Sequence, residues 1–282
     1  MASVTLEHVS YVYEPGTPFE VKALDDVSLT VRDGSVTGII GHTGSGKSTM
    51  VQLFNGLEKP NSGRILLDGK DIWENPKKMR EIRFRVGLVM QYPEYQLFEE
   101  SVRADIAFGP RNMGLSEREI AERVAEAAAL VGLDESDLDK SPFDLSGGQK
   151  RRAAIAGIMA MRPEVLVLDE PAAGLDPRGR DVILGAVRDY GRTTGATVII
   201  VSHSMEDMAS YCDDIVVMAR AKVFLQGTRD EVFAHATELE SVGLDVPQIT
   251  HFALRLAERG VALPQGIYTV QSALEALLPL FE

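Results

Sequence analysis

The 282-residue sequence predicts an α/β fold built around a mostly parallel sheet, and two features of the pattern indicate this class. Short apolar runs rich in β-branched residues resemble strands that are buried on both faces, as the strands of parallel sheets are. Helical segments separate these runs, as crossover connections require. The expected strands are 36–40, 86–90, 165–168, 197–201 and 215–218.

Two segments near the N-terminus have a different pattern. Residues 4–9 and 27–31 alternate apolar and polar side chains, which is typical of half-exposed antiparallel strands. We therefore expect a small antiparallel β subdomain beside the parallel sheet.

A long stretch in the middle of the chain has helix signals only. Ser116 and Glu119 form a capping-box pattern ahead of an amphipathic run, which predicts the start of a helix. No strand pattern interrupts this stretch. We expect residues 92–161 to form a mostly helical insertion in the α/β body.

The C-terminal part of the chain is also predicted to be helical. Thr228 and Glu231 form a second capping-box pattern, after which the strand-like alternation stops. Apolar residues then fall on one face of a terminal helix, which Pro279 must bend or end. The residues of this face are Val270, Leu274, Leu277, Leu278 and Phe281.

The composition excludes some classes of protein. Apolar residues make up 45% of the chain, enough for a sizeable core, and the net charge is −13. Because contacts to nucleic-acid phosphates need clustered lysine and arginine, this charge argues against nucleic-acid binding as the main activity. Cys212 is the only cysteine, so an intramolecular disulfide is impossible and we expect a small buried apolar side chain.

The sequence predicts neither a membrane span nor an export signal. The strongest apolar run, residues 153–161, is far shorter than the ~20 residues that a bilayer requires. The N-terminal residues lack a basic start and an apolar signal core. A partner would have to bring this protein to a membrane.

The strongest chemical motif follows the expected strand 36–40. Residues 41–49 match G-x-x-x-x-G-K-[ST] and lead into a helical stretch, the context that a phosphate-binding P-loop requires. Its backbone N–H groups would form an anion site at a helix N-terminus, with Lys47 reaching the β- and γ-phosphates and Ser48 ligating Mg²⁺. The residues of the motif are Gly41, His42, Thr43, Gly44, Ser45, Gly46, Lys47, Ser48 and Thr49.

A second motif places two carboxylates at the end of an apolar strand. Asp169 and Glu170 follow the expected strand 165–168. Downstream of a P-loop, Asp169 is a candidate Mg²⁺ ligand, and Glu170 is a candidate base that polarises the attacking water.

A third motif, LSGGQ at residues 145–149, predicts another anion site at the start of a helix. One nucleotide on one P-loop does not need two such sites. LSGGQ, with the P-loop and LVLDE, resembles the ATP-binding cassette (ABC) family, in which two cassettes pack head to tail and each LSGGQ closes over the ATP of the opposite P-loop. The residues of LSGGQ expected at the nucleotide are Ser146, Gly147, Gly148 and Gln149.

The resemblance implies a domain organisation and the cofactors ATP and Mg²⁺. It assigns 1–235 to a P-loop ABC ATPase core with an antiparallel β subdomain and an α-helical subdomain at about 92–161. It assigns 236–282 to a helical C-terminal extension that supports pairing of two ATPases.

The resemblance also implies further site residues. Gln91, after the expected strand 86–90, would sense Mg²⁺ and water, and His203 would contact the γ-phosphate. Asp176, in the GLD sequence 174–176, would lie in the loop that crosses the dimer seam. Tyr13 would stack on adenine, with Tyr11 as the alternative. The chain departs from the family at Ala172, where a threonine usually follows the proline, and this leaves the catalytic pair intact.

Longer stretches narrow the resemblance within the ABC family. Residues 91–102 (QYPEYQLFEESV), 107–110 (AFGP), 147–152 (GGQKRR) and 173–177 (AGLDP) resemble the ATPases of energy-coupling factor transporters, most closely the second of two paralogous ATPases. The resemblance implies ATP-driven uptake of vitamins or transition-metal ions. It implies as partners a second ABC ATPase (a paralogue or a second copy), a transmembrane coupling subunit and a substrate-binding membrane subunit, at the cytoplasmic face of the membrane.

Two other classes share part of this pattern. The ATPase of a conventional ABC transporter would have the same catalytic residues and a different partner, and residues 92–110 argue against it. A soluble ABC protein of translation or DNA repair would need tandem cassettes or a long coiled coil, and the sequence predicts neither. The transported substrate, and the choice between a homodimer and a heterodimer, stay open.

The stretch after Gln91 also suggests a docking surface. It combines the carboxylates of Glu94, Glu99 and Glu100 with aromatic side chains, and an acidic groove of this kind would accept a short helix with a basic residue. The alternative for the carboxylates alone is a solvated acidic face. The aromatic residues are Tyr92, Tyr95 and Phe98.

Overall fold

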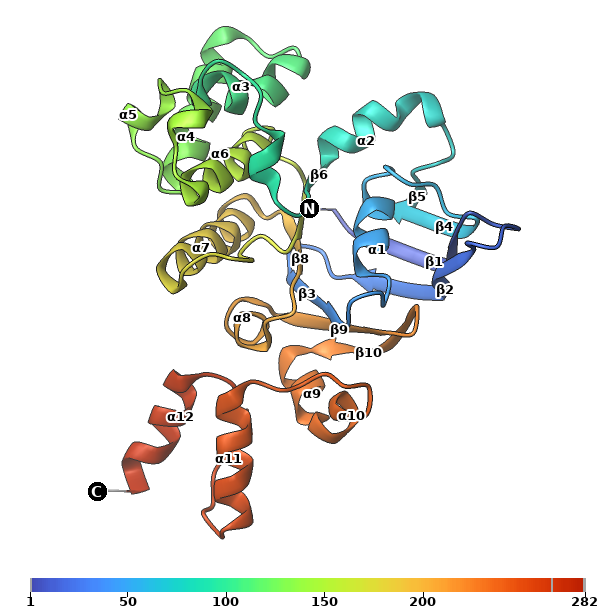
Figure 1. The fold of residues 1–282 in the computed structure, drawn as a ribbon, viewed down its shortest axis with the longest axis vertical. Helices are drawn as coiled ribbons and strands as arrows, with labels where there is room; N and C mark the ends of the chain where they lie inside the picture. Colours follow the sequence, from blue (N-terminus) through green and yellow to red (C-terminus); the bar gives the residue numbers. More distant parts are fainter. Residues whose placement is uncertain (1, 265, 281–282) are drawn as a thin grey trace.

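A computed structural model describes residues 2–264 and 266–280 (Figure 1). Within these residues the larger sheet has the strand order β10-β9-β3-β8-β7-β6. The four pairings from β9 to β6 join parallel strands, whereas the edge strand β10 runs antiparallel to β9. The strands are β3 (Val36–Gly41), β6 (Val86–Val89), β7 (Val165–Asp169), β8 (Thr197–Val201), β9 (Asp214–Ala219) and β10 (Lys222–Thr228).

The predicted parallel sheet is therefore confirmed. All residues of β3, β7 and β8 are buried, which explains their nearly continuous apolar sequence. The edge strand β10 was not predicted. It alternates exposed and half-buried residues and lies against β9 on one side only.

A smaller antiparallel sheet has the order β2-β1-β4-β5. Figure 1 shows it beside α1, away from the green helical part of the chain. The predicted strands 4–9 and 27–31 lie in β1 and β2, whereas β4 and β5 were not predicted. The strands are β1 (Val4–Tyr13), β2 (Val21–Val31), β4 (Ser62–Leu67) and β5 (Lys70–Asp71).

Two apolar cores hold these layers together. One joins the antiparallel sheet to α1 and to one face of the larger sheet. The other joins the opposite face of the larger sheet to helices between residues 102 and 211, and it includes Cys212, which is buried as predicted. The helices of the body are α1 (Lys47–Phe54), α2 (Met79–Arg85), α7 (Pro177–Thr194), α8 (Met205–Tyr211) and α9 (Arg229–Ala234).

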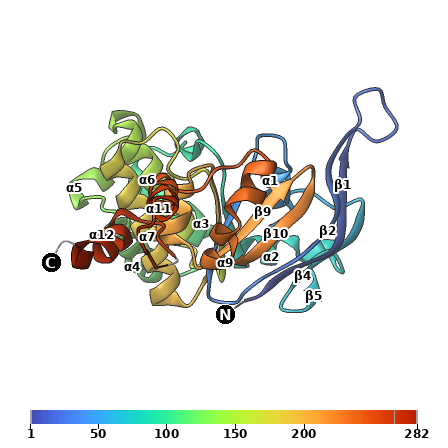
Figure 2. The ribbon, with the colours of Figure 1, turned by 90° about the horizontal axis from the view of Figure 1, so that it is seen from below.

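The middle of the chain folds as helices that pack on one another (Figures 1 and 2). Ser116 caps α4 through the predicted capping box with Glu119. The elements here are the 3₁₀ turns η2 (Pro93–Gln96) and η3 (Pro142–Asp144) and the helices α3 (Val102–Asn112), α4 (Glu117–Leu130), α5 (Glu135–Leu138) and α6 (Gly147–Met159).

The C-terminal residues form α10 (Ala236–Ser241), α11 (Gln248–Glu258) and α12 (Val270–Leu277), drawn in orange to red in Figure 1. Pro279 lies in the 3₁₀ turn η4 (Leu278–Leu280) that ends α12, as predicted, and Phe281 lies outside the described residues. No helix in the ranges 2–264 and 266–280 is long and apolar enough to cross a membrane.

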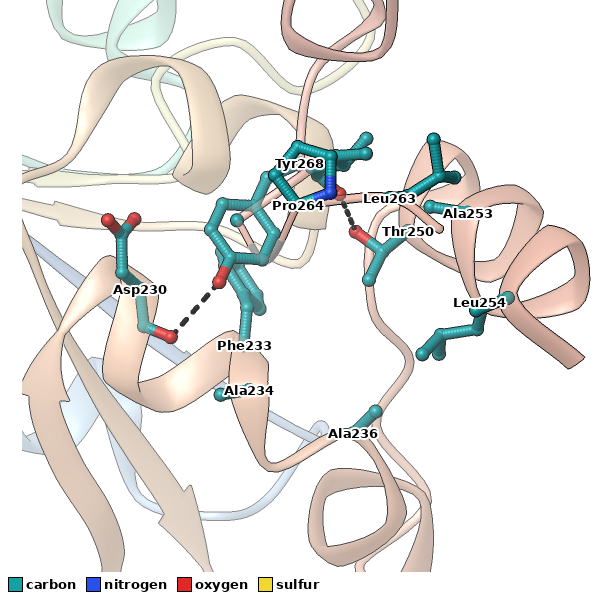
Figure 3. Close-up of a pocket in the computed structure, with 13 residues that line it drawn as sticks. Asp230, Phe233, Ala234, Ala236, Thr250, Ala253, Leu254, Leu263, Pro264 and Tyr268 are labelled. Atoms are coloured by element: carbon teal, nitrogen blue, oxygen red, sulfur yellow. Dashed lines mark hydrogen bonds between the residues drawn. The ribbon is translucent and has the colours of Figure 1, made fainter. Parts of the chain in front are cut away.

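A cavity of about 450 Å³ separates α11 from α9 and from the segment before α12 (Figure 3). Hydrogen bonds cross its edges. The Tyr268 hydroxyl donates to the Asp230 carbonyl over 3.1 Å, and the Thr250 hydroxyl donates to the Ile267 carbonyl over 2.9 Å. The C-terminal helices are thus attached to the body at α9.

Candidate nucleotide site

Four neighbouring parallel strands end at the same edge of the larger sheet, in the order β3, β8, β7 and β6. Their registers align these ends: Val201 pairs with both Ile39 and Asp169, and Leu168 pairs with Val89. The loops that follow the strands carry the P-loop, His203, Glu170 and Gln91. Ligands of open α/β sheets bind outside the carboxyl ends of the strands, so this edge is the place to look for a site.

The P-loop passes from β3 into α1 through a glycine whose backbone conformation other residues rarely adopt. Gly46 has φ +102° at the N-cap of α1, and a Cβ there would overlap the Ala23 carbonyl. Among the described residues, no side chain caps this helix. The first-turn N–H groups of α1 therefore keep their capacity to bind an anion. The Lys47 ammonium donates to the carbonyls of Gly41 (2.6 Å) and His42 (2.9 Å).

Asp169 lies directly behind Lys47 and Ser48. It is 7% exposed, and burial raises the pKa of its carboxyl, while a hydrogen bond with the Ser48 side chain and the charge of Lys47 oppose the rise. Burial likewise lowers the pKa of Lys47, against the charges of Glu170 and Asp169. The side chains of Ser48, Asp169 and Gln91 each offer an oxygen atom as a metal ligand. Oxygen ligands suit Mg²⁺.

Glu170 has φ +51°, in the left-handed region that non-glycine residues rarely adopt. Its N–H donates to the Val201 carbonyl over 2.9 Å. The Glu170 side chain is 13% exposed, and both carboxylate oxygens lie 3.0 Å from Nδ1 of His203, whose ring is 75% exposed. The neighbouring ends of β7 and β8 thus bring a shielded carboxylate and an accessible imidazole together.

A cavity of about 600 Å³ opens at these strand ends. It brings together seven residues that the sequence singles out. They are Gly41, His42, Thr43, Lys47, Gln91, Glu170 and His203.

The C-terminal extension forms part of the same cavity, which the sequence did not predict. Gly243, Leu244 and Asp245 line it, and the His42 ring lies in hydrogen-bonding contact with the Val242 carbonyl. Leu244 is buried in the core of the body. No motif in residues 242–245 indicates this position.

Tyr13 lies beside the first turn of α1, outside the group of residues that lines the cavity. Its hydroxyl is 3.0 Å from the Thr49 hydroxyl, and the residue is 37% exposed. Tyr11 packs edge-on against it and donates its hydroxyl to Glu58 over 2.6 Å. Of the two tyrosines, Tyr13 therefore has the freer ring.

The LSGGQ residues lie elsewhere in the chain. Ser146 is the N-cap of α6 and forms a capping box with Gln149, whose amide also donates to Asp137 over 3.1 Å. Asp176 is the N-cap of α7 and accepts from the Gly179 N–H over 2.9 Å. Among the described residues that line the P-loop cavity, none comes from LSGGQ.

The acidic stretch after Gln91 differs from the prediction at one residue. The Glu94 side chain is 16% exposed and forms a bidentate ion pair with Arg151, with N–O distances of 2.7 and 3.0 Å. Because Arg151 occupies its carboxylate, Glu94 does not belong to an acidic groove or a solvated acidic face with Glu99 and Glu100. The sequence could not reveal the pair, because its members lie 57 positions apart.

Comparisons with known proteins define the class. Residues 24–173 match the ABC transporter family. A dimeric ATP-binding cassette solved in a post-hydrolysis state with ADP and Pi superposes with a TM-score of 0.72, at 26% identity, over 80% of this chain and 98% of that one. The chain belongs to the ABC transporter family of ATPases, and membership implies that it binds and hydrolyses ATP.

Closer relatives define the branch of the family. The energy-coupling factor transporter ATP-binding protein EcfA2 of Clostridium tetani is 54% identical over 99% of this chain and 97% of its own length. EcfA2 of Clostridium acetobutylicum is 53% identical over 99% and 98%. The structure of cbiO1 from Clostridium perfringens, part of the ABC transporter complex cbiONQ, has a TM-score of 0.76 at 42% identity, over 89% and 98%. Within the family, this chain is an energy-coupling factor transporter ATP-binding protein.

Proposed function

We propose that this chain powers an energy-coupling factor transporter by hydrolysing ATP in a composite site shared with a second ABC ATPase, and that the transporter imports vitamins or transition-metal ions. The observation that supports this proposal most directly is that the two helix N-termini expected to bind phosphate, those of α1 and α6, lie apart. The P-loop cavity holds α1, Gln91, Glu170 and His203, while the start of α6 lies outside it. One chain therefore supplies half of each site.

The P-loop half carries the chemistry of hydrolysis. Lys47 and the P-loop, including Thr49, bind the phosphates. The Tyr13 ring stacks on adenine, with Tyr11 as the alternative. Ser48, Gln91 and Asp169 would hold Mg²⁺, which would supply positive charge to stabilise the negative charge of the phosphates.

Glu170 activates the attacking water. Its carboxylate orients the water and accepts its proton, and His203 lies ready to contact the γ-phosphate. The pair of His203 with Glu170 supports this assignment, because it places an N–H donor beside the base.

The LSGGQ half acts across the dimer. Ser146 and Gly148 donate to the γ-phosphate of the nucleotide on the second cassette, and Gly147 and Gln149 complete the helix start. Asp176 lies in the loop that crosses the seam. The second cassette is either another copy of this chain or a paralogue. The related cassette that was solved as a dimer with ADP and Pi supports the pairing of two cassettes.

A groove of about 360 Å³ between α2, α3 and α6 is the docking site that we assign to the transmembrane coupling subunit. The rings of Phe84, Phe98 and Phe108 line it together with Asp105. A short helix with a basic residue fits this combination of aromatic surface and carboxylate. Docking there holds the chain at the cytoplasmic face of the membrane, while a separate membrane subunit selects the substrate.

The C-terminal extension, residues 236–282, supports pairing of the two ATPases. Its helices α11 and α12 and the turn η4 expose apolar side chains that would be buried against a second ATPase. These side chains, each about half exposed, are Phe252, Leu254, Leu274, Leu278 and Leu280.

Steady-state ATPase activity of the purified chain, measured across protein concentration with Glu170→Gln as the control, tests this proposal. Self-pairing predicts a rate that rises with the square of concentration and is lost in the control. Nucleotide binding without turnover would assign the second half-site to a paralogue or a membrane-bound complex. Undiminished turnover in Glu170→Gln would refute the assigned chemistry.

A further inference from the structure

Arg151 lies in the second turn of α6, and its side chain is 5% exposed. A buried guanidinium is rare unless it is paired. Here Nε and Nη2 donate to the two carboxylate oxygens of Glu94, over 3.0 and 2.7 Å. The third nitrogen, Nη1, donates to the Ala173 carbonyl. The guanidinium also lies 5.9 Å from the centre of the Tyr92 ring.

These contacts join three segments that are distant in sequence. Tyr92 and Glu94 lie one and three residues after Gln91. Ala173 closes a turn that begins at Glu170, because the Ala173 N–H donates to the Glu170 carbonyl over 3.2 Å. Tyr92 and Ala173 both line the P-loop cavity. Arg151 thus holds two walls of that cavity from behind, and it does so from the helix that begins with LSGGQ.

Both walls have strained backbones that need support. Tyr92 has φ +55° and Glu170 has φ +51°. Such conformations persist at a cost only where surrounding contacts determine them. The planar guanidinium fork fixes direction as well as distance, which an ammonium group does not.

We propose that Arg151 is a positioning residue that couples the LSGGQ helix to Gln91 and Glu170, so that nucleotide bound across the dimer sets the hydrolytic geometry on the other side of the same chain. The inference rests on the proposed composite site. It extends that proposal by naming the side chain that links a chain's two half-sites.

Packing alone does not explain the ion pair. Ala153, Ile155, Ala156 and Met159 already bury α6 against the core. A buried ion pair is often no more stabilising than an apolar pair of similar volume. A purely structural role would therefore tolerate apolar replacement of both partners, whereas a positioning role would not.

The test compares the double variant Glu94→Leu, Arg151→Met with the parent chain under conditions where the parent hydrolyses ATP. We expect kcat to fall roughly 10- to 100-fold, the effect of misplacing catalytic groups by about an ångström. We expect KM and the binding of a fluorescent ATP analogue to change less than about twofold, because the P-loop does not contact Arg151. Arg151→Lys, which keeps the charge and loses the fork, should show the same split if the double variant does not fold.

Arg103→Met is the matched control. Arg103 pairs with Glu135 and Asp139 in the same subdomain, but this ion pair is exposed and distant from the P-loop cavity. Its removal should leave kcat unchanged. Wild-type kcat in both the double variant and Arg151→Lys would overturn the inference.

ATP-dependent protection from hydrogen exchange, measured in a Glu170→Gln background, distinguishes a positioning role of Arg151 from a purely structural one. ATP should slow exchange at residues 146–150 and 92–96 in this background, and the Arg151 variants should lose the effect at 92–96 only. Equal protection at 92–96 with and without Arg151 would also overturn the inference. If the parent chain neither hydrolyses ATP nor pairs, the proposed function fails instead, so the two failures are distinguishable.

Discussion

The first turns of α1 and α6 are both anion sites by sequence, yet they differ in structure. The start of α1 has Gly46 as its N-cap, and no side chain among the described residues caps it. The start of α6 is closed by Ser146 and Gln149, which satisfy each other's backbone N–H groups. The P-loop is therefore preformed for phosphate, whereas LSGGQ is stabilised by its own cap.

The difference indicates how the two sites are used. A preformed cradle beside Lys47 and Glu170 suits a nucleotide that binds within one chain. A capped helix N-terminus is stable in the absence of a second cassette, because its backbone N–H groups are hydrogen-bonded within the chain. When a second cassette brings a phosphate, the Ser146 hydroxyl can exchange its bond with Gln149 for the anion.

The largest expected effect is on the P-loop side. Glu170→Gln should lower turnover by about 10²- to 10⁴-fold, because the amide cannot accept the proton of the attacking water. Binding of a fluorescent ATP analogue should remain near that of the parent chain. If turnover and analogue binding fell together, Glu170 would be part of the binding site and not the base.

The next effect is on the LSGGQ side. Ser146→Ala should lower turnover roughly 10- to 100-fold through loss of a hydrogen bond to a charged group. It should also lower the free energy of unfolding by about 1 kcal/mol through loss of the cap.

Ser116→Ala is the matched control for this variant. Ser116 caps α4 through the same type of box, away from the nucleotide cavity. Denaturant unfolding should show a similar loss of about 1 kcal/mol, with unchanged ATPase. Equal ATPase in both serine variants would reduce LSGGQ to an ordinary helix start.

The smallest expected effect is on the stability contributed by the Glu94–Arg151 ion pair, and it depends on pH. Burial is the largest single influence on the pKa of Glu94 and would raise it, but the hydrogen bond from Arg151, a backbone hydrogen bond and the charge of Arg151 together outweigh burial and hold the pKa below the ordinary 4.5. The pair therefore adds stability above pH 4.5 that is lost as the pH falls through the lowered pKa.

Thermal melting of Glu94→Gln and the parent chain, from neutral pH down to about pH 3, measures this effect. The parent should melt at the higher temperature at neutral pH, and the gap should close on acidification. Glu100→Gln, at an exposed position in the same stretch, should show no such gap. A gap that is constant with pH would mean that Glu94 stabilises by packing and not by charge.

The sequence predicted the parts of the fold that are set by local pattern. The central strands have continuous apolar sequences because both of their faces are buried. β10 was missed because it is an edge strand whose residues alternate between exposed and half-buried, and β4 because its first residues, Ser62 to Arg64, are exposed. Neither has the apolar run by which strands were recognised.

The same limit applies to the site. The P-loop, the LVLDE pair and LSGGQ are contiguous motifs, so their residues could be named in advance. The pair of Arg151 with Glu94, and the wall formed by Gly243 to Asp245, depend on contacts between segments that are distant in sequence. Such contacts leave no local pattern, and only the folded chain reveals them.

The most direct test of the central claim is a mixing experiment with Lys47→Ala and Ser146→Ala, at a concentration where the chain is dimeric. Each variant alone has two defective composite sites. A mixed dimer has one site with both defects and one with an intact P-loop and an intact LSGGQ. Composite sites predict that the mixture hydrolyses ATP well above the mean of the two variants measured separately. A rate equal to that mean would show that each chain works alone, and would contradict the account.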